Sequence, residues 1–337
     1  MRSPPAHVGV WRAVVLRFEF GSVRKGKGAD AAKTRRLDGH GLFDGICEKS
    51  PVHNCYQLLQ NRMNDVLAHQ NITPGLGAEL APEIQLTSLS DGQISELQQL
   101  ASERGIVVAR GQVMSLQEQA DFAHRLGEPL TRPTNPSEIP SELIRIMADE
   151  NSKHAAGEGW HSDVSSESEP PGLSMLRMEV VPSAGGDTLF ANMYAAYESL
   201  SPAMQAFVET LTAKHDPVGH YLYVSGAKKL EELPSAIHPV VRIHPDTGRK
   251  ALYVNVGFVS RIIGLNRRES QALLQLLYDH VAYSANIQCR VSWQPGTVVF
   301  WDNRCVQHFA AFDYFPEKRL GYRATIRGEK PIPAQRL

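Results

Sequence analysis

Apolar positions repeat at helical spacing in two stretches of the chain. Residues 90–104 place apolar side chains three and four positions apart, which predicts a helix that ends at Gly105. The continuous apolar run 106–109 then predicts a buried strand. Residues 115–126 return to the helical spacing and predict a second helix, with Gly127 as its end.

From residue 143 onward, short apolar runs separated by turn residues predict a series of strands. These are Leu143–Met147, Leu173–Val181, Val240–His244, Ala251–Val256, Val298–Trp301 and Leu320–Ile326. Two further predicted helices, Ser201–Leu211 and Asn266–Val281, interrupt the strands. Many short strands with few helices are typical of two antiparallel sheets packed together. We therefore predict a mostly β fold with flanking helices, a double-stranded β-helix (jelly roll).

The beginning of the chain has a different composition. Its first forty residues carry nine basic and three acidic side chains, with frequent glycine and no sustained apolar period. Such a segment buries little surface, so we predict a basic, loosely ordered extension over residues 1–70 and one domain over residues 71–337. The basic, acid-poor character also resembles a transit peptide, although the segment is not rich in serine and contains Asp30 and Asp38.

Charge and cysteine content exclude several classes of protein. The chain has 35 Lys and Arg against 36 Asp and Glu, a balance that argues against binding nucleic acid or an anionic membrane. No apolar run approaches the roughly 18–20 residues that span a bilayer. The four cysteines have no paired spacing and are predicted to be reduced and mostly buried. We expect a cytoplasmic protein, and a homo-oligomer is compatible with the sequence.

The candidate chemistry begins with His161 and Asp163, which lie two residues apart. In an extended segment alternate side chains point to the same side, so both could bind one ion. The same pattern occurs as an ordinary surface pair, so a third ligand is needed, and His308 is the best candidate. Two imidazoles and one carboxylate on one face of an ion leave three positions open, which is typical of non-haem Fe(II) oxygenases.

Two arginines add to this pattern. Arg319 and Arg323 lie four residues apart in a predicted strand and therefore face the same side. A pocket-facing arginine requires an anion, because an unpaired buried charge is costly. The guanidinium fork suits a carboxylate, and two such groups near a metal would suit two different anions. Two structural salt bridges at the surface are the alternative.

Residues 72–332 resemble the taurine/2-oxoglutarate dioxygenase family, which also includes alkylsulfatases and aryloxyacetate dioxygenases. The segments that carry the resemblance are Gly75–Glu79, Trp160–Val164, Gly185–Leu189, Trp301–Arg304 with Gln307 and His308, and Arg319–Ile326. Their order and separations also fit the family. Within it, the chain is most similar to the fungal sulfonate-dioxygenase-like branch.

The resemblance implies roles for the candidate residues. Three would bind Fe(II): His161, Asp163 and His308. Arg319 and Thr188 would hold the far carboxylate of the cosubstrate 2-oxoglutarate. A guanidinium together with a neutral hydroxyl donor suits a carboxylate that needs several hydrogen bonds.

At the substrate end the resemblance implies Arg323 for an acidic head group and Phe258 as an aromatic wall. Taurine-specific members have a His and a Tyr where this chain has Arg132 and Asn135, and an Asn where it has Gly157. Arg132 would provide a second anion contact or lie in solvent. We expect taurine to be a poor substrate, because a glycine offers no side-chain bond, and bulkier acids to be preferred.

The implied function is an Fe(II)- and 2-oxoglutarate-dependent dioxygenase that hydroxylates a small sulfonate, sulfate ester or carboxylate and releases succinate and CO2. Its expected partners are this acidic organic substrate and O2, with no nucleic acid and no membrane. Two alternatives stay open. The same three ligands could hold zinc in a hydrolase that uses a metal-activated water. A jelly-roll binding protein without catalysis is the other alternative.

Overall fold

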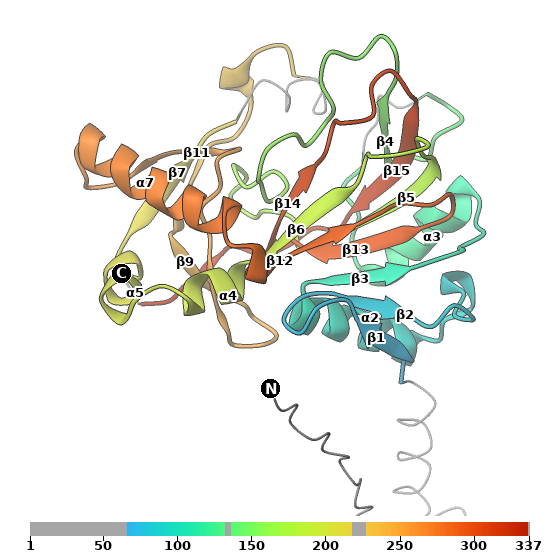
Figure 1. Cartoon of the computed structure of the whole chain (residues 1–337), viewed down its shortest axis with the longest axis horizontal. Coiled ribbons are helices and arrows are strands. Elements are labelled where there is room, and N and C mark those ends of the chain that lie inside the picture. The colour runs from blue at the N-terminus through green and yellow to red at the C-terminus, as the bar shows by residue number, and fades with distance from the viewer. Residues whose placement is uncertain (1–65, 132–135, 218–226, 336–337) are drawn as a thin grey trace, which may run out of the picture. The chain divides into compact units, whose positions relative to one another are not determined.

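The largest sheet of the molecule has seven strands in the order β1-β2-β3-β13-β5-β15-β4 (Figure 1). The computed structural model describes residues 66–131, 136–217 and 227–335, which lie within the compact unit Cys55–Leu337. The strands of this sheet are β1 His69–Asn71, β2 Ala78–Leu80, β3 Ile106–Ala109, β4 Leu143–Ala148, β5 Leu173–Val180, β13 Val298–Asp302 and β15 Arg319–Thr325. All its neighbouring strands are antiparallel except β2 and β3, which run parallel.

A second sheet joins β12 Gln288–Val291, β6 Thr188–Asn192 and β14 Val306–Ala310 in that order. Its strands pair antiparallel, and His308 of β14 lies opposite Phe190 of β6. One apolar cluster joins the two sheets, with Met178 from β5, Phe190 from β6 and Val299 from β13 all completely buried. Two mostly antiparallel sheets that share a core in this way make the predicted jelly roll.

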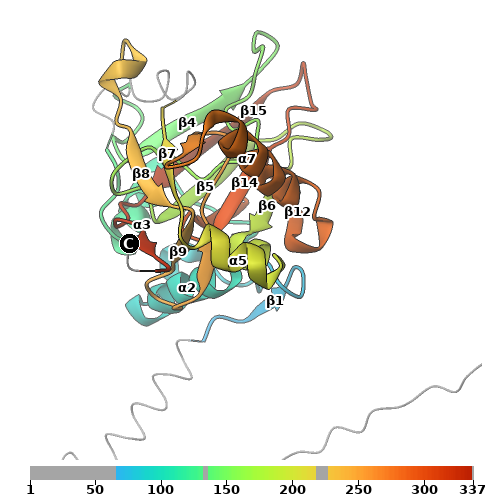
Figure 2. The same cartoon turned by 90° about the vertical axis from the view of Figure 1, so that its left-hand side faces the viewer.

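Two small sheets and three helices extend this core. One sheet has the order β10-β9-β16 and the other β11-β7-β8. Their strands are β7 Thr212–His215, β8 Ala236–Pro239, β9 Val241–Ile243, β10 Lys250–Leu252, β11 Val259–Ile262 and β16 Ile332–Pro333. The helices are α4 Met193–Glu198, α5 Pro202–Val208 and α7 Arg267–Ala282. Figures 1 and 2 both show α7 beside these short strands and away from α2 and α3.

The two helices predicted before residue 130 are confirmed as α2 Asp91–Arg104 and α3 Leu116–Leu126. Each begins with a capping box. The serine hydroxyl accepts the backbone N–H of the third helical residue, and the side chain of that residue accepts the backbone N–H of the serine. Gly105 ends α2 with φ +75°, a left-handed conformation that favours glycine. The apolar sides of both helices pack against residues of the large sheet in a second core cluster.

The folded part begins earlier than the predicted boundary at residue 71. Leu67 is 1% exposed within a core cluster, and β1 pairs with β2 from His69 onward. Residues 66–70 therefore belong to the folded domain and not to the extension. The rest of the predicted extension, residues 1–65, lies outside the described residues, as do Arg132 and Asn135.

Most predicted strands are present, with changed ends. The predicted strand 251–256 ends at Leu252, because the Asn255 side chain accepts the Phe258 N–H in a turn. The predicted helix 201–211 is the shorter α5, and α4 was not predicted. Cys289 and Cys305 are free and buried, as expected, whereas Cys47 and Cys55 lie outside the described residues. In the described part of the chain, no helix combines the length and the apolar character needed to cross a membrane.

Candidate active site

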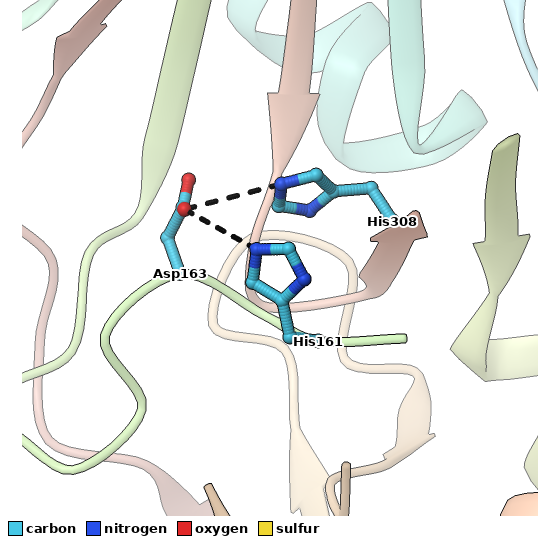
Figure 3. Close-up of side chains that lie close together, drawn as sticks. All are labelled: His161, Asp163 and His308. Carbon is cyan, nitrogen blue, oxygen red and sulfur yellow. Dashed lines mark ion pairs between the residues drawn. The ribbon is translucent and has the colours of Figure 1, made fainter. Parts of the chain in front are cut away.

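His161, Asp163 and His308 meet at one point inside the jelly roll (Figure 3). The Nε2 atoms of both histidines lie 3.9 Å from Oδ1 of Asp163. His308 stands on β14, and His161 is bound to it through the main chain: each residue donates its N–H to the other's carbonyl, at 3.1 and 2.8 Å. The backbone pairing therefore sets the spacing of the two imidazoles.

The protonation states of the three side chains suit a cation. Burial lowers the pKa of both histidines, and that of His308 falls well below its usual value, so both rings are neutral near pH 7. Burial alone would raise the pKa of Asp163, but the charge of Arg323 and the neighbouring imidazoles lower it overall, and the carboxyl is ionised. His161 Nδ1 lies 2.9 Å from the Gly159 carbonyl and must donate to it, so Nε2, which faces Asp163, is the ring nitrogen that carries the lone pair.

These donors fit a divalent transition metal. Two imidazole nitrogens and one carboxylate oxygen lie within 4.8 Å of one another, so one ion can contact all three. All three residues are buried, and no other carboxylate lines the surrounding cavity among the described residues. Two histidines and one carboxylate with open positions suit Fe(II) chemistry.

The turn after Asp163 is strained. Val164 has φ +44°, a left-handed conformation that a β-branched residue rarely adopts. Its carbonyl accepts the Glu167 N–H at 3.1 Å, which closes the turn. Strain of this kind costs on the order of 1–3 kcal/mol and persists where the surroundings fix it, often at functional sites. Here the strained turn follows Asp163 directly and reverses the chain next to this proposed metal ligand.

Arg319 lies in the same cavity as a buried cation without an acid. Its exposure is 4%, and its Nε donates to the Gly186 carbonyl at 3.0 Å. Within the described parts of the chain, no carboxylate forms an ion pair with it, and burial lowers its pKa. Its guanidinium carbon lies 5.6 Å from the ring centre of Trp293. Such a group favours the binding of an anion.

Thr188 is held beside this arginine. The indole N–H of Trp293 donates to the Thr188 hydroxyl oxygen at 3.0 Å. Because that oxygen already accepts a bond, its own hydrogen remains available for an acceptor in the cavity. Arg319 and Thr188, the pair to which the family resemblance assigns the far carboxylate of 2-oxoglutarate, therefore both present hydrogen-bond donors to an anion in this cavity.

Arg323 has a different partner from the one expected. Its Nη1 donates to Oδ1 of Asp163 at 2.6 Å, the same oxygen that faces both histidines. The anion that this pocket-facing arginine requires is therefore already present in the protein, because Arg323 neutralises the buried Asp163 carboxylate. The Nε of Arg323 is buried without a hydrogen-bond partner among the described residues, so the guanidinium retains donor capacity.

Gly157 and Phe258 both reach the cavity. Phe258 is 3% exposed and lines the cavity wall. A Cβ on Gly157 would lie 3.2 Å from Cε1 of His161, and its φ is +92°. The glycine therefore allows the backbone to approach the imidazole closely, and this position has no spare room for a side chain. An Asn here would press on the histidine.

All seven predicted site residues line one cavity. Gly157, already considered at the substrate end, also lines the cavity. The remaining lining residues, which sequence reasoning did not assign to the site, are Ile146, Ala156, Val164, Leu176, Trp293, Trp301 and Ala310. Most of them are apolar and lie far apart along the chain, so no sequence pattern indicated that they meet at one cavity. For Trp293 the sequence offered one weak indication of a role in the site: a large aromatic residue stands between polar residues just before a Pro-Gly turn.

A second group of potential ligands consists of His244, Asp302 and Cys305. His244 Nδ1 accepts the Asp246 N–H at 3.2 Å, so its Nε2 carries the hydrogen and donates to Asp302 at 3.0 Å. Arg304 also binds both carboxylate oxygens of Asp302. Burial raises the pKa of the Cys305 thiol, which disfavours a thiolate ligand. These contacts make the group a structural network.

Comparisons with known proteins identify the family of the chain. Residues 68–325 match the model of the family described as taurine catabolism dioxygenase TauD, TfdA family. An α-ketoglutarate-dependent sulfonate dioxygenase of Saccharomyces cerevisiae is 37% identical over 279 residues, covering 78% of this chain and 67% of the relative. An α-ketoglutarate-dependent sulfate ester dioxygenase of Pseudomonas putida is 33% identical over 270 residues, covering 76% and 86%.

A solved structure is also similar to this chain. The crystal structure of a taurine dioxygenase from Burkholderia xenovorans is 31% identical, with a TM-score of 0.69 over 80% of this chain and 93% of that one. The chain therefore belongs to the TauD/TfdA family of dioxygenases.

Proposed function

We propose that this 2-oxoglutarate-dependent dioxygenase holds Fe(II) on His161, Asp163 and His308 and uses O2 to hydroxylate a small acidic substrate, with release of succinate and CO2. One observation carries the proposal: two neutral imidazoles and an ionised carboxylate converge in a cavity that also holds two guanidiniums. When bound, Fe(II) would supply the oxidation chemistry that no side chain can perform. The side chains would bind and orient the reactants.

Arg319 and Thr188 would bind the far carboxylate of 2-oxoglutarate. The support is the buried guanidinium without an acid partner and the hydroxyl whose hydrogen is free. Charge-assisted bonds to a carboxylate are shorter and stronger than neutral ones. Binding would also remove the cost of keeping an unpaired cation in an apolar wall.

Arg323 would contact the acidic group of the substrate while it stays bonded to Asp163. A guanidinium has five donors, of which one is used on the carboxylate. The side chain would thus link the substrate's charge to the metal ligand. This places the acidic head group at a fixed side of the metal and orients the neighbouring C–H bond for hydroxylation.

The apolar cavity wall supports a substrate with an alkyl or aryl body. Ile146, Val164, Leu176 and Phe258 all line the cavity and offer no hydrogen bonds to an amine. The relatives named for sulfonates and sulfate esters have substrates with an acidic head. We expect medium-chain alkanesulfonates, alkyl sulfate esters or aryl acids to be better substrates than taurine.

A zinc hydrolase with the same ligands is less well supported. Such an enzyme needs a positioned base to activate water, and Asp163 is the only carboxylate on the cavity wall among the described residues. That carboxylate is already engaged by Arg323. A binding protein without catalysis would not explain why every candidate side chain is retained around one cavity.

The test is succinate formation and O2 uptake with Fe(II), 2-oxoglutarate and a substrate panel. We expect one succinate per substrate oxidised, with kcat/KM higher for a medium-chain alkanesulfonate or sulfate ester than for taurine. Asp163→Ala is the matched inactive control. A protein that forms no succinate with any acid, yet binds Fe(II), would contradict the proposed reaction. Preference for taurine by tenfold or more would contradict only the substrate assignment.

A further inference from the structure

Behind Asp163 lies a buried polar network that none of the proposed roles uses. It consists of Ser174 on β5 with Trp301 and Asn303 at the end of β13. We propose that Ser174 and Asn303 are positioning residues that fix the orientation of the Asp163 carboxylate for metal binding. This inference rests on the proposed metal site.

Ser174 separates the roles of the two carboxylate oxygens. Its hydroxyl donates to Oδ2 of Asp163 at 2.8 Å, on the side away from the histidines. Oδ1 is thereby the oxygen that faces both imidazoles and Arg323. Without the bond from Ser174, the guanidinium of Arg323 could take both oxygens as a fork, and the carboxylate would turn from the metal position.

Asn303 fixes Ser174 and Asp163 at the same time. Its Nδ2 donates to the Ser174 hydroxyl at 2.9 Å and to the Gly172 carbonyl at 3.2 Å. Its Oδ1 accepts the Asp163 backbone N–H and the Trp301 indole N–H, both at 3.1 Å. All four hydrogen-bonding positions of the amide are therefore used, and only one orientation of the Asn303 side chain satisfies them.

Because the network is buried, each of its polar groups needs a hydrogen-bond partner within the protein. Ser174 is completely buried, and Asn303 and Asp163 are 2% and 3% exposed, so bulk water cannot replace a lost bond. The directions of the bonds also form a chain, because Ser174 accepts from Asn303 and must use its own hydrogen on Asp163. An unpaired polar group here would be costly, which favours a single arrangement of the carboxylate.

Two variants and a matched control test this role. Ser174→Ala removes the bond to Oδ2, and Asn303→Asp keeps the shape but replaces the amide donor. Ser166→Ala is the control, because Ser166 is also completely buried and its hydroxyl has no hydrogen-bond partner in the described parts of the chain. Mn(II) affinity is measured by electron paramagnetic resonance, and the melting temperature is measured in EDTA.

Both positioning variants should bind Mn(II) about 10- to 100-fold more weakly than the unsubstituted protein, which is typical when a residue that supports a metal ligand is lost. Ser166→Ala should retain the affinity, and all variants should melt as cooperative folded proteins. Unchanged affinity in both positioning variants, or an equal loss in Ser166→Ala, would overturn the inference. Failure of the unsubstituted protein to bind Mn(II) would instead overturn the metal site itself.

Discussion

Replacing Arg319 with Gln separates ligand binding from protein stability. Arg319 is buried and has no carboxylate partner among the described residues, so its charge should serve the cosubstrate more than the fold. Charge-assisted bonds contribute about 1.5–3 kcal/mol, so the variant should bind 2-oxoglutarate about 10- to 150-fold more weakly. Loss of the bond to Gly186 costs about 1 kcal/mol, and removal of the buried charge offsets this cost.

The assay is the rise in melting temperature that 2-oxoglutarate causes in the Mn(II)-loaded protein without O2. At 100 times its dissociation constant, a ligand stabilises the unsubstituted protein by about 2.7 kcal/mol. A 30-fold weaker variant would gain only about 0.9 kcal/mol at the same concentration. Since 1 kcal/mol corresponds to about 2–4 °C for a domain of this size, the two rises differ measurably.

Arg319→Lys is the control for charge alone, because lysine retains the cation but lacks the fork. It should bind 2-oxoglutarate with intermediate affinity. An equal 2-oxoglutarate-induced rise in Arg319→Gln and the unsubstituted protein would refute the reasoning. So would a ligand-free Arg319→Gln protein that melts far below the unsubstituted one, because the charge would then support the fold.

Three further variants test other parts of the account. Arg323→Gln should raise the KM of the acidic substrate at least about tenfold, while 2-oxoglutarate turnover without substrate persists in a succinate assay. Gly157→Ala should weaken Mn(II) binding, because its Cβ would meet the His161 ring at 3.2 Å and its φ of +92° is unfavourable. Burial lowers the pKa of His215 to about 3. Its unfolded pKa is about 6.5, so stability is lost as the pH falls below that value, by about 1.3 kcal/mol between about pH 7 and 5.5. In urea denaturation, the stability of His215→Gln should therefore fall by about 1.3 kcal/mol less than that of the unsubstituted protein over this pH range, while the other buried histidines still contribute.

Local sequence signals predicted the elements that local interactions determine. The caps and apolar spacing of α2 and α3 lie within each helix, so their bounds could be inferred closely. The bounds of the short strands β7, β8 and β11 could not be inferred, because a segment of four residues acquires a strand conformation only through pairing with distant segments. The turn at Asn255 likewise depends on a side-chain bond that shortens a predicted strand.

In the candidate site, too, local spacing could be read from the sequence, whereas contacts between distant residues could not. The spacing of His161 and Asp163, and of Arg319 and Arg323, indicated shared faces that the structure places on one cavity. The bond between Arg323 and Asp163 could not be inferred, because it joins residues 160 positions apart. The close approach of Gly157 to His161 is also a tertiary feature. Sequence spacing thus suggested which residues assemble, and packing decided their partners.

The central claim is that one cavity holds the metal on His161, Asp163 and His308 and the far carboxylate of 2-oxoglutarate on Arg319. A crystal structure of the protein with Mn(II) and 2-oxoglutarate, prepared without O2, tests it most directly. We predict the metal within about 2.0–2.3 Å of the three side chains and the distal carboxylate against the Arg319 guanidinium and the Thr188 hydroxyl. A metal bound elsewhere, or 2-oxoglutarate held away from Arg319, would contradict the account.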